Sequence, residues 1–368
     1  MDAIILVWLG FFALVATLLA LDLGVFHRKS HEIKMREAIG WTVFWIAVGL
    51  SFTAVVYFLY PEAKPAAPTP DNPEMYDRWE AIAAYLGGYI MEKMLSVDNL
   101  FIFVILFSFF GVKAKDQHHV LFWGILGALV MRGLFIFIGV AAIEKWEWIL
   151  FFFGGLLIYS AARMAYTGDA EFNPAESRTY RFLRRILPFS DKPHEGKFFI
   201  RGNGRRMGTC LLLCLFMVEM TDILFAIDSV PAVIGIARDR FIIYTSNVFA
   251  ILGLRSLYFV IAGGLQSFKY LKPGLVLILG FIGAKMILGG PSIPLIEQMG
   301  GPHFPLIEIS VYASLSVVII ILGVAVAASA VSARRARRKK HARPPPPRDK
   351  EKSETCAGEH RPGEGKKV

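Results

Sequence analysis

Apolar residues in this chain are gathered into long runs, separated by polar and charged segments. Nine of these runs are about 20 residues long or longer, the length that an α-helix needs to cross the roughly 30 Å hydrocarbon core of a bilayer. The pattern therefore predicts an all-α polytopic membrane protein with about nine transmembrane helices. The predicted spans are 3–25, 39–60, 80–110, 119–143, 147–166, 209–236, 241–263, 273–290 and 306–331.

Composition and charge agree with a membrane protein. Of the 368 residues, 55% are hydrophobic and 19% are charged, less charge than a soluble protein of this length carries. Basic residues cluster after the first span, in the loop 167–208 and after the last span, which places these segments in the cytoplasm. The N-terminus is then outside and the C-terminus inside. Because these clusters account for the net charge of +10, we expect no nucleic-acid partner.

The predicted organisation is a membrane domain, 1–332, followed by a disordered, basic and proline-rich cytoplasmic tail, 333–368. The basic start of the tail is expected to touch anionic membrane lipids. The loop 167–208 is a candidate docking site for protein partners. The membrane domain divides into two N-terminal helices with an outer loop (1–79), a first repeat (80–166), the basic loop (167–208), a second repeat (209–290) and a last helix (306–332).

Two of the apolar runs carry acidic motifs with matching spacing. In Glu92-Lys-Met-Leu-Ser-Val-Asp98-Asn99, an acid is followed after five residues by Asp and a small polar residue. The same spacing recurs from Asp222 to Asp228-Ser229, with Glu219 just upstream. An ionised side chain in the membrane centre costs roughly 2.5–3.5 kcal/mol on insertion scales, so these acids indicate function.

The segments that follow the acidic motifs also match. Ile125-Leu-Gly, followed by Arg132, parallels Ile251-Leu-Gly-Leu-Arg255, and Ala162-Arg-Met parallels Ala284-Lys-Met. Spans three to five therefore repeat as spans six to eight. Because three is odd, the second copy enters the membrane from the opposite side. An inverted three-plus-three helix repeat of this kind is typical of secondary transporters.

Helical geometry leaves two arrangements open for the acids. In a continuous helix, Asp98 and Asp228 lie about 120° away from the other acids of their motifs. Either they pair with Arg132 and Arg255, or the helices unwind and all the acids converge. Pro231 lacks the N–H that would bond the carbonyl four residues earlier, so a helix break is predicted there. Three further bases are expected to extend from span ends towards the interface: Lys93, Arg163 and Lys285.

Hard oxygen ligands of this kind suit Mn²⁺, Mg²⁺ or Ca²⁺. The ion is expected as transported substrate, and no resident cofactor is predicted. Arg132 and Arg255 are expected to balance the carboxylate charge. The predicted metal-site residues are Glu92, Asp98, Asn99, Glu219, Asp222, Asp228 and Ser229.

The paired motifs from Glu92 to Asn99 and from Glu219 to Pro231, with the arginines of the following spans, resemble the TerC family of tellurium-resistance-associated integral membrane proteins. The layout over 1–332 is most similar to the Alx-type branch. The resemblance implies a bacterial inner-membrane protein of the LysE-like transporter superfamily, linked to manganese export and to metal supply for secreted enzymes. It also implies that the acids of both motifs, with Asn99, form the metal site.

The sequence thus predicts an exporter of divalent cations, Mn²⁺ first and Ca²⁺ second, that works by alternating access with proton coupling as an option. One alternative is an exporter of small organic solutes such as amino acids. Another is a membrane scaffold or stress- and redox-linked protein in which the acids are merely paired. An enzyme is not expected, because no nucleophile–base set, haem ligand pair or phosphate loop is found.

Overall fold

A computed structural model describes residues 2–26, 34–64, 76–167, 174, 177–186, 189, 196–202, 205–264, 270–290, 307 and 309–342. The tail was predicted to be disordered over 333–368, but its first part, 333–342, is helical and continues the last membrane helix, so the prediction is wrong there. Residues 343–368 lie outside the described residues, and parts of the loop 167–208 do so as well.

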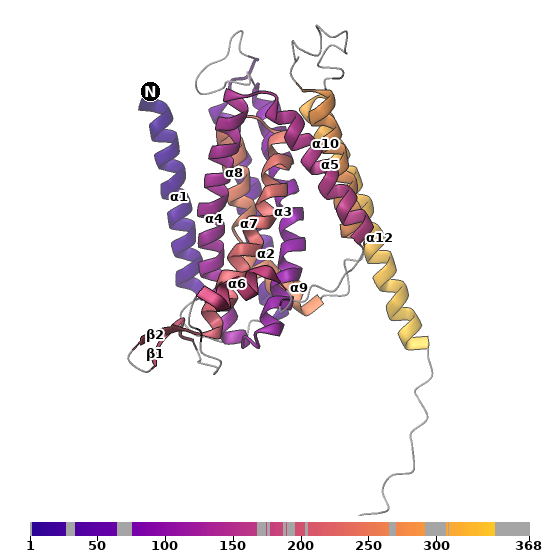
Figure 1. Ribbon diagram of the computed structural model, residues 1–368. Helices are drawn as coiled ribbons and strands as arrows, with labels where there is room; N and C mark the ends of the chain where they lie inside the picture. The colour runs from indigo at the N-terminus through magenta and orange to yellow at the C-terminus, as the bar shows by residue number, and fades with distance from the viewer. Residues whose placement is uncertain are drawn as a thin grey trace, which may run out of the picture.

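The described chain is almost entirely helical (Figure 1). A short antiparallel hairpin of β1 (Phe199–Gly202) and β2 (Arg205–Gly208) is its one sheet. The helices are α1 (Asp2–Phe26), α2 (Met35–Leu59), α3 (Arg78–Phe109), α4 (Ala114–Lys145), α5 (Ile149–Thr167), α6 (Arg178–Ile186), α7 (Cys210–Ile236), α8 (Arg240–Ile251), α9 (Leu254–Gly264), α10 (Leu271–Leu288) and α12 (Val311–Ala342).

The helices confirm the prediction of an all-α polytopic membrane protein. Seven of them are long and apolar enough to cross a membrane, and α8 with α9, bent by 45°, makes an eighth span. Helix α3 is not among these seven, but it has the length of a span, 32 residues, and carries three charged residues near its centre, Glu92, Lys93 and Asp98. Counted with α3, the helices match the nine predicted spans one for one.

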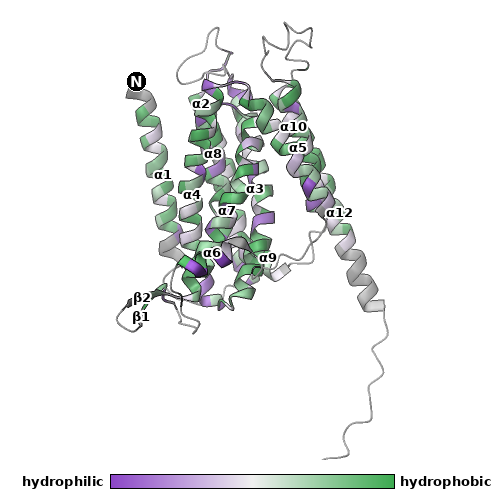
Figure 2. Cartoon of the chain, viewed as in Figure 1, coloured by the Kyte–Doolittle hydropathy of each residue, from purple (hydrophilic) through white to green (hydrophobic). Residues whose placement is uncertain are grey.

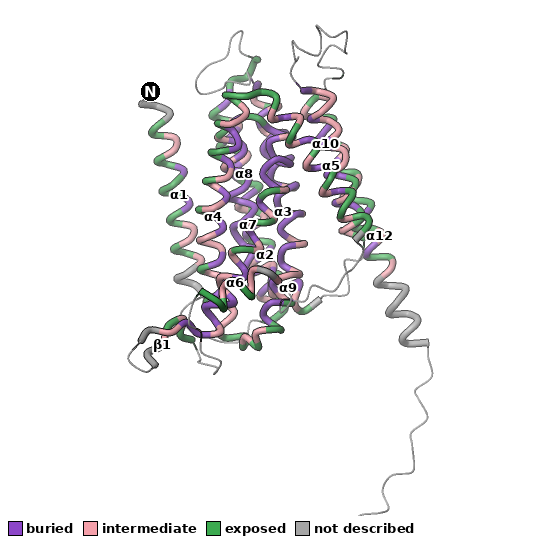
Figure 3. The backbone as a smooth tube through the Cα atoms, in the orientation of Figure 1, coloured by how far each residue is buried: buried purple, intermediate pink, exposed green. Residues whose placement is uncertain are grey.

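Apolar side chains cover the outside of the bundle as well as its core. Figure 2 shows hydrophobic residues along the outer helices, and Figure 3 shows that burial is concentrated in the central ones. Phe137 of α4 is 70% exposed and Leu224 of α7 is 61% exposed. Exposed apolar surface of this extent is what contact with lipid requires.

Local sequence sets where the central helices begin. Asp77 accepts hydrogen bonds from the backbone N–H groups of Trp79 and Glu80, and the Glu80 carboxylate accepts from the N–H of Asp77. This capping box satisfies N–H groups that the first turn of α3 leaves without a partner. Helix α7 begins in a similar way, with the Thr209 hydroxyl accepting from the N–H of Leu212.

Helix α3 lies at the centre of the bundle, in contact with α2, α7, α8 and α12. Helix α4 packs against α7, and α5 packs along α10. Gly154 of α5 and Gly283 of α10 bring the latter two backbones together: a Cβ at 154 would lie 2.9 Å from the Gly283 oxygen, and one at 283 would lie 2.8 Å from the Gly154 oxygen.

The ends of the bundle agree with the predicted distribution of loops. Helix α6, the β-hairpin and the C-terminal end of α12 lie at one end, and the N-terminus of α1 lies at the other (Figure 1). The basic loop and the start of the tail are therefore on the same side, as charge placement requires. Which side of the membrane this is stays a prediction.

The helix break occurs in a different place from the predicted one. Helix α7 runs unbroken from Cys210 to Ile236 with Pro231 inside it, so the break predicted at Pro231 is wrong. A proline removes one backbone hydrogen bond, and transmembrane helices tolerate that loss where neighbouring helices pack around it. The chain is instead interrupted between α8 and α9, where Gly253 has φ +83°.

Candidate functional site

A buried arginine joins the two acidic motif helices. Arg132 of α4 is 1% exposed and forms ion pairs with Glu92 of α3 and with Asp222 of α7. Its Nη2 lies 3.0 Å from Oδ1 of Asp222. The hydroxyl of Ser96, one turn along α3, donates to Oε1 of Glu92 at 3.0 Å. Two ionised carboxylates and one guanidinium would leave this cluster with a formal charge of −2 + 1 = −1.

The two carboxylates on Arg132 occupy equivalent positions of the repeated motif. Glu92 precedes Asp98, and Asp222 precedes Asp228, by the same number of residues. The structure thus brings together one acid from each copy. One of the two arrangements that the sequence leaves open pairs Asp98 and Asp228 with the arginines, because these acids lie on a different helix face from Glu92 and Asp222. For Arg132 that pairing is wrong, since its partners are the other two acids.

Asp228 faces a different helix. Its Oδ1 accepts a hydrogen bond of 2.6 Å from the Ser160 hydroxyl of α5, and Arg163, one turn further on, interacts with it electrostatically. Because α7 is continuous, Asp222 and Asp228 point in directions about 120° apart. The second acid of this motif therefore lies against α5, away from the Arg132 cluster.

Glu219 lies beside α4, at a position that glycine keeps open. A Cβ added at Gly127 would overlap the Glu219 carboxylate, so the absence of a side chain there makes room for it. Asp222, one turn along α7, is an electrostatic neighbour of the same carboxylate. Asp98 of α3 is half-buried.

Several buried polar atoms near the motifs have no hydrogen-bond partner among the described residues. They are Oε2 of Glu92, Nδ2 of Asn99 and Oγ of Ser229. Most buried polar atoms in proteins have a partner, so each of these atoms calls for an ion, a water molecule or a change of conformation that provides one.

The predicted metal-site residues do not surround a single point. In the part of the chain that the structure describes, no three His, Cys, Asp or Glu side chains lie close enough together to hold a metal ion. Glu92 and Asp222 meet at Arg132, Asp228 is bound to Ser160, and Glu219 lies at Gly127. Whether these residues bind a metal stays a prediction.

Arg255, the second predicted charge-balancing residue, is also buried, with 1% exposed. Its Nη2 lies 2.9 Å from Oδ1 of Asp22 in α1 and donates to the Asp22 backbone oxygen at 2.7 Å. Sequence reasoning missed this residue. The available signal was that Asp22 is an acid inside the first apolar run.

Replacing Asp22 with Asn is expected to lower the free energy of unfolding by about 1.5–3 kcal/mol, because the buried Arg255 guanidinium loses a charged hydrogen-bond acceptor. Denaturant unfolding in detergent micelles measures this. The exposed Glu147→Gln variant is the control and should stay within about 0.5 kcal/mol of the native protein. An Asp22→Asn variant as stable as this control would show that the ion pair contributes nothing to stability.

The chain is similar to a group of bacterial membrane proteins. The family model described as "Integral membrane protein TerC family" matches residues 77–337. A relative from Myxococcus xanthus, an uncharacterised membrane protein called STKORF319, is 44% identical over 76% of this chain and 83% of its own length. A protein of Escherichia coli K12, provisionally named membrane-bound redox modulator Alx, is 40% identical over 77% of this chain and 86% of its own. No solved structure matches significantly.

The family match covers both acidic motifs, Arg132, Arg255, every helix from α3 to α10 and most of α12. It extends over well more than half of the chain, and the two relatives cover most of their own lengths. This protein therefore belongs to the TerC family of integral membrane proteins.

Proposed function

We propose that this protein is a transporter that exports divalent metal cations, Mn²⁺ first and Ca²⁺ second, from the cytoplasm. One observation carries the proposal: Glu92 and Asp222, equivalent acids of two motif copies, meet on Arg132 inside a membrane-spanning bundle. Buried ionisable groups within membrane helices are costly, and they commonly mark ion pathways.

In this proposal Arg132 takes the place of the transported cation. Its guanidinium pairs with both Glu92 and Asp222 while no metal is bound, which leaves the cluster one negative charge in excess. A divalent cation entering between the two carboxylates would displace the guanidinium and satisfy the same charges. The unpartnered oxygens of Glu92 and Ser229 are hard donors of the kind that Mn²⁺ and Ca²⁺ accept, and Asn99 has a carboxamide oxygen of the same type. In a conformation with rearranged helices, the cation would also be bound by Asp98, Glu219 and Asp228.

The packing of the helices supports an inverted repeat, which alternating access would use. If α3, α4 and α5 correspond to α7, α8–α9 and α10, then the contact of α3 with α8 is the counterpart of that between α7 and α4. The contacts α3–α7 and α5–α10 then join equivalent helices. This is the pattern that a pseudo-twofold axis in the membrane plane would give. Carboxylates that bind either metal or protons would allow metal–proton antiport.

We expect proteoliposomes that contain the native protein to carry Mn²⁺ across the bilayer, as measured with a metal-sensitive dye inside. Glu92→Gln and Asp222→Asn should slow this flux at least about tenfold, the scale seen even for residues that only support metal ligands. The exposed Glu147→Gln variant is the matched control and should transport normally. Runs with and without a pH gradient test proton coupling. Unchanged Mn²⁺ flux in both variants would contradict the proposal.

A second candidate is a membrane scaffold or modulator in which the acids serve stability alone. The observation in its favour is that Arg132 already pairs with both carboxylates. It predicts that the triple variant Arg132→Met/Glu92→Gln/Asp222→Asn, which keeps the volume and removes the charges, stays functional in cells. The transporter proposal predicts loss of metal export in the same variant, so a measurement of cellular Mn²⁺ separates the two.

A further inference from the structure

The break between α8 and α9 leaves backbone carbonyls without helical partners. Helix α8 ends at Ile251, α9 begins at Leu254, and the two axes differ by 45°. Gly253 between them has φ +83°, which only glycine adopts readily. The last carbonyls of a helix have no N–H to accept from, and they carry its partial negative charge.

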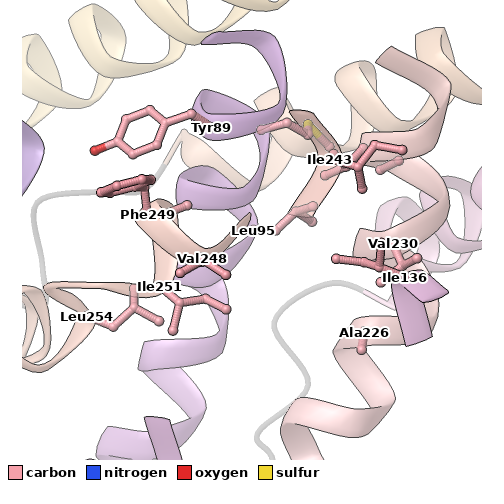
Figure 4. Packing of buried hydrophobic residues seen from close by; sticks show 14 of the residues in the cluster. Tyr89, Leu95, Ile136, Ala226, Val230, Ile243, Val248, Phe249, Ile251 and Leu254 are labelled. Atoms are coloured by element: carbon pink, nitrogen blue, oxygen red, sulfur yellow. The ribbon is translucent and has the colours of Figure 1, made fainter. Parts of the chain in front are cut away.

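A lysine from the neighbouring motif helix lies at these carbonyls. Nζ of Lys93 in α3 donates to the oxygen of Ala250 at 3.0 Å and to the oxygen of Leu252 at 3.3 Å. The ring of Tyr89, one turn earlier, is 6.0 Å from the same nitrogen. Lys93 is half-buried and does not extend to the interface, so the prediction made for it was wrong. Figure 4 shows Ile251 and Leu254 on either side of the break, with Tyr89 nearby.

Within the described residues, Lys93 forms no ion pair with a carboxylate. An ammonium group inside a membrane protein is unfavourable unless polar groups replace its water. The two carbonyls are therefore the groups that solvate it, as backbone oxygens solvate cations in channels and transporters.

The two motif copies differ at this contact. Gly253 belongs to the sequence Ile-Leu-Gly, and the matching glycine of the first copy is Gly127. Helix α4 continues straight through Gly127, whereas the second copy is broken at Gly253. The residue after Glu92 is Lys93, whereas the residue after the equivalent acid, Asp222, is Ile223. The broken helix is thus the one that faces a lysine, and the continuous helix faces a motif without one.

We propose that the carbonyls of Ala250 and Leu252 form a binding site for a primary ammonium group, which Lys93 fills from within the same chain. The contact holds α8 and α9 in their broken arrangement against α3. Lys93 is thus a positioning residue for the break. This assignment does not depend on metal transport, and its test uses no transport measurement.

Hydrogen exchange of the full-length protein in micelles tests the site directly. The informative amides flank the break: Leu252 N–H bonds to the oxygen of Val248 at 3.0 Å, and Leu257 N–H bonds to that of Gly253 at 3.1 Å. Lys93→Met, which keeps the length of the side chain, should speed exchange in peptides covering 248–258 about tenfold, because charged hydrogen bonds are lost. Lys93→Arg should retain most of the protection. The exposed Lys145→Met variant should match the native protein.

Chemical rescue then tests whether an ammonium group is what the site binds. In Lys93→Ala, added n-propylammonium should restore the protection of 248–258, because it fits the space and supplies N–H donors. Tetramethylammonium has the same charge but no donor, and it should not restore protection. The rescue of Lys93→Ala also tests the proposal if Lys93→Met fails to fold.

Three results would overturn the proposal. The first is native protection of 248–258 in Lys93→Met, which would make Gly253 alone responsible for the break. The second is an equal loss of protection in α5 and α10, which would mean general destabilisation. The third is rescue by tetramethylammonium as well as by n-propylammonium, or by neither, which would assign Lys93 a screening or packing role.

Discussion

Replacing Arg132 with Met is expected to lower the free energy of unfolding by about 3–5 kcal/mol, the usual cost of removing one partner from a buried ion pair. The cost arises because Glu92 and Asp222 would remain buried without a cation. Glu92 is fully buried and Asp222 is 5% exposed, so water reaches neither readily. Denaturant unfolding in mixed micelles, followed by the loss of tertiary fluorescence, measures the change.

Two further variants separate charge from packing at Arg132. The triple variant Arg132→Met/Glu92→Gln/Asp222→Asn removes the stranded charges and should recover most of the lost stability, because a buried ion cluster replaced as a whole is often tolerated. Arg185→Met, at an exposed site on α6, should change stability by less than about 0.5 kcal/mol. If Arg132→Met behaved like Arg185→Met, the buried cluster would have no role in stability.

Gly253→Ala is expected to lower the free energy of unfolding by about 2–4 kcal/mol, from left-handed backbone strain and overpacking together. The residue has φ +83°, and an added Cβ would overlap the Cβ of Trp45 in α2. Trp45 is 2% exposed and packed in the core, so it has little room to move.

The matching glycine of the first repeat provides the control for Gly253. Gly127 lies in the continuous helix α4, and an added Cβ would meet only the end of the flexible Glu219 side chain. Gly127→Ala should therefore cost less than about 1 kcal/mol, since alanine favours a helix and the carboxylate can move aside. Equal stability losses in the two alanine variants would contradict the different roles that the structure gives these glycines.

The membrane spans could be predicted from sequence because span length and hydrophobicity are local properties. Even α3, with Glu92, Lys93 and Asp98 inside it, was recognised, because the apolar residues around these charges are numerous enough to fill a span. The start of α3 is likewise local, since Asp77 and Glu80 form a capping box within one turn.

The partners of the charged residues could not be predicted, because they depend on which helix faces come together. Arg255 and Asp22 are 233 residues apart, and nothing in the sequence around either indicates the other. The same limit applies to Arg132, for which pairing with Asp98 or Asp228 is only one of the two arrangements that the sequence leaves open. Spacing showed that the acids of one motif lie on different faces, but not which face meets α4.

Predictions from local sequence were wrong where tertiary contacts compensate for a locally unfavourable residue. Pro231 is a helix breaker by propensity, yet α7 passes through it. Gly253 carries the break because its backbone conformation and its contact with Trp45 both exclude a side chain. Lys93 was expected at an interface because a lone lysine in lipid is unfavourable, and two backbone carbonyls remove that reason.

The close approach of Gly154 and Gly283 has a mechanical consequence. With each backbone oxygen less than 3 Å from where the other glycine would carry a Cβ, α5 and α10 cannot slide or rotate against one another without first separating. The pair should move as a single rigid body, so any large motion must occur where it meets its other neighbours, chiefly α12 and α7. The Asp228–Ser160 hydrogen bond crosses the boundary with α7, so a movement of the pair away from α7 would have to break it.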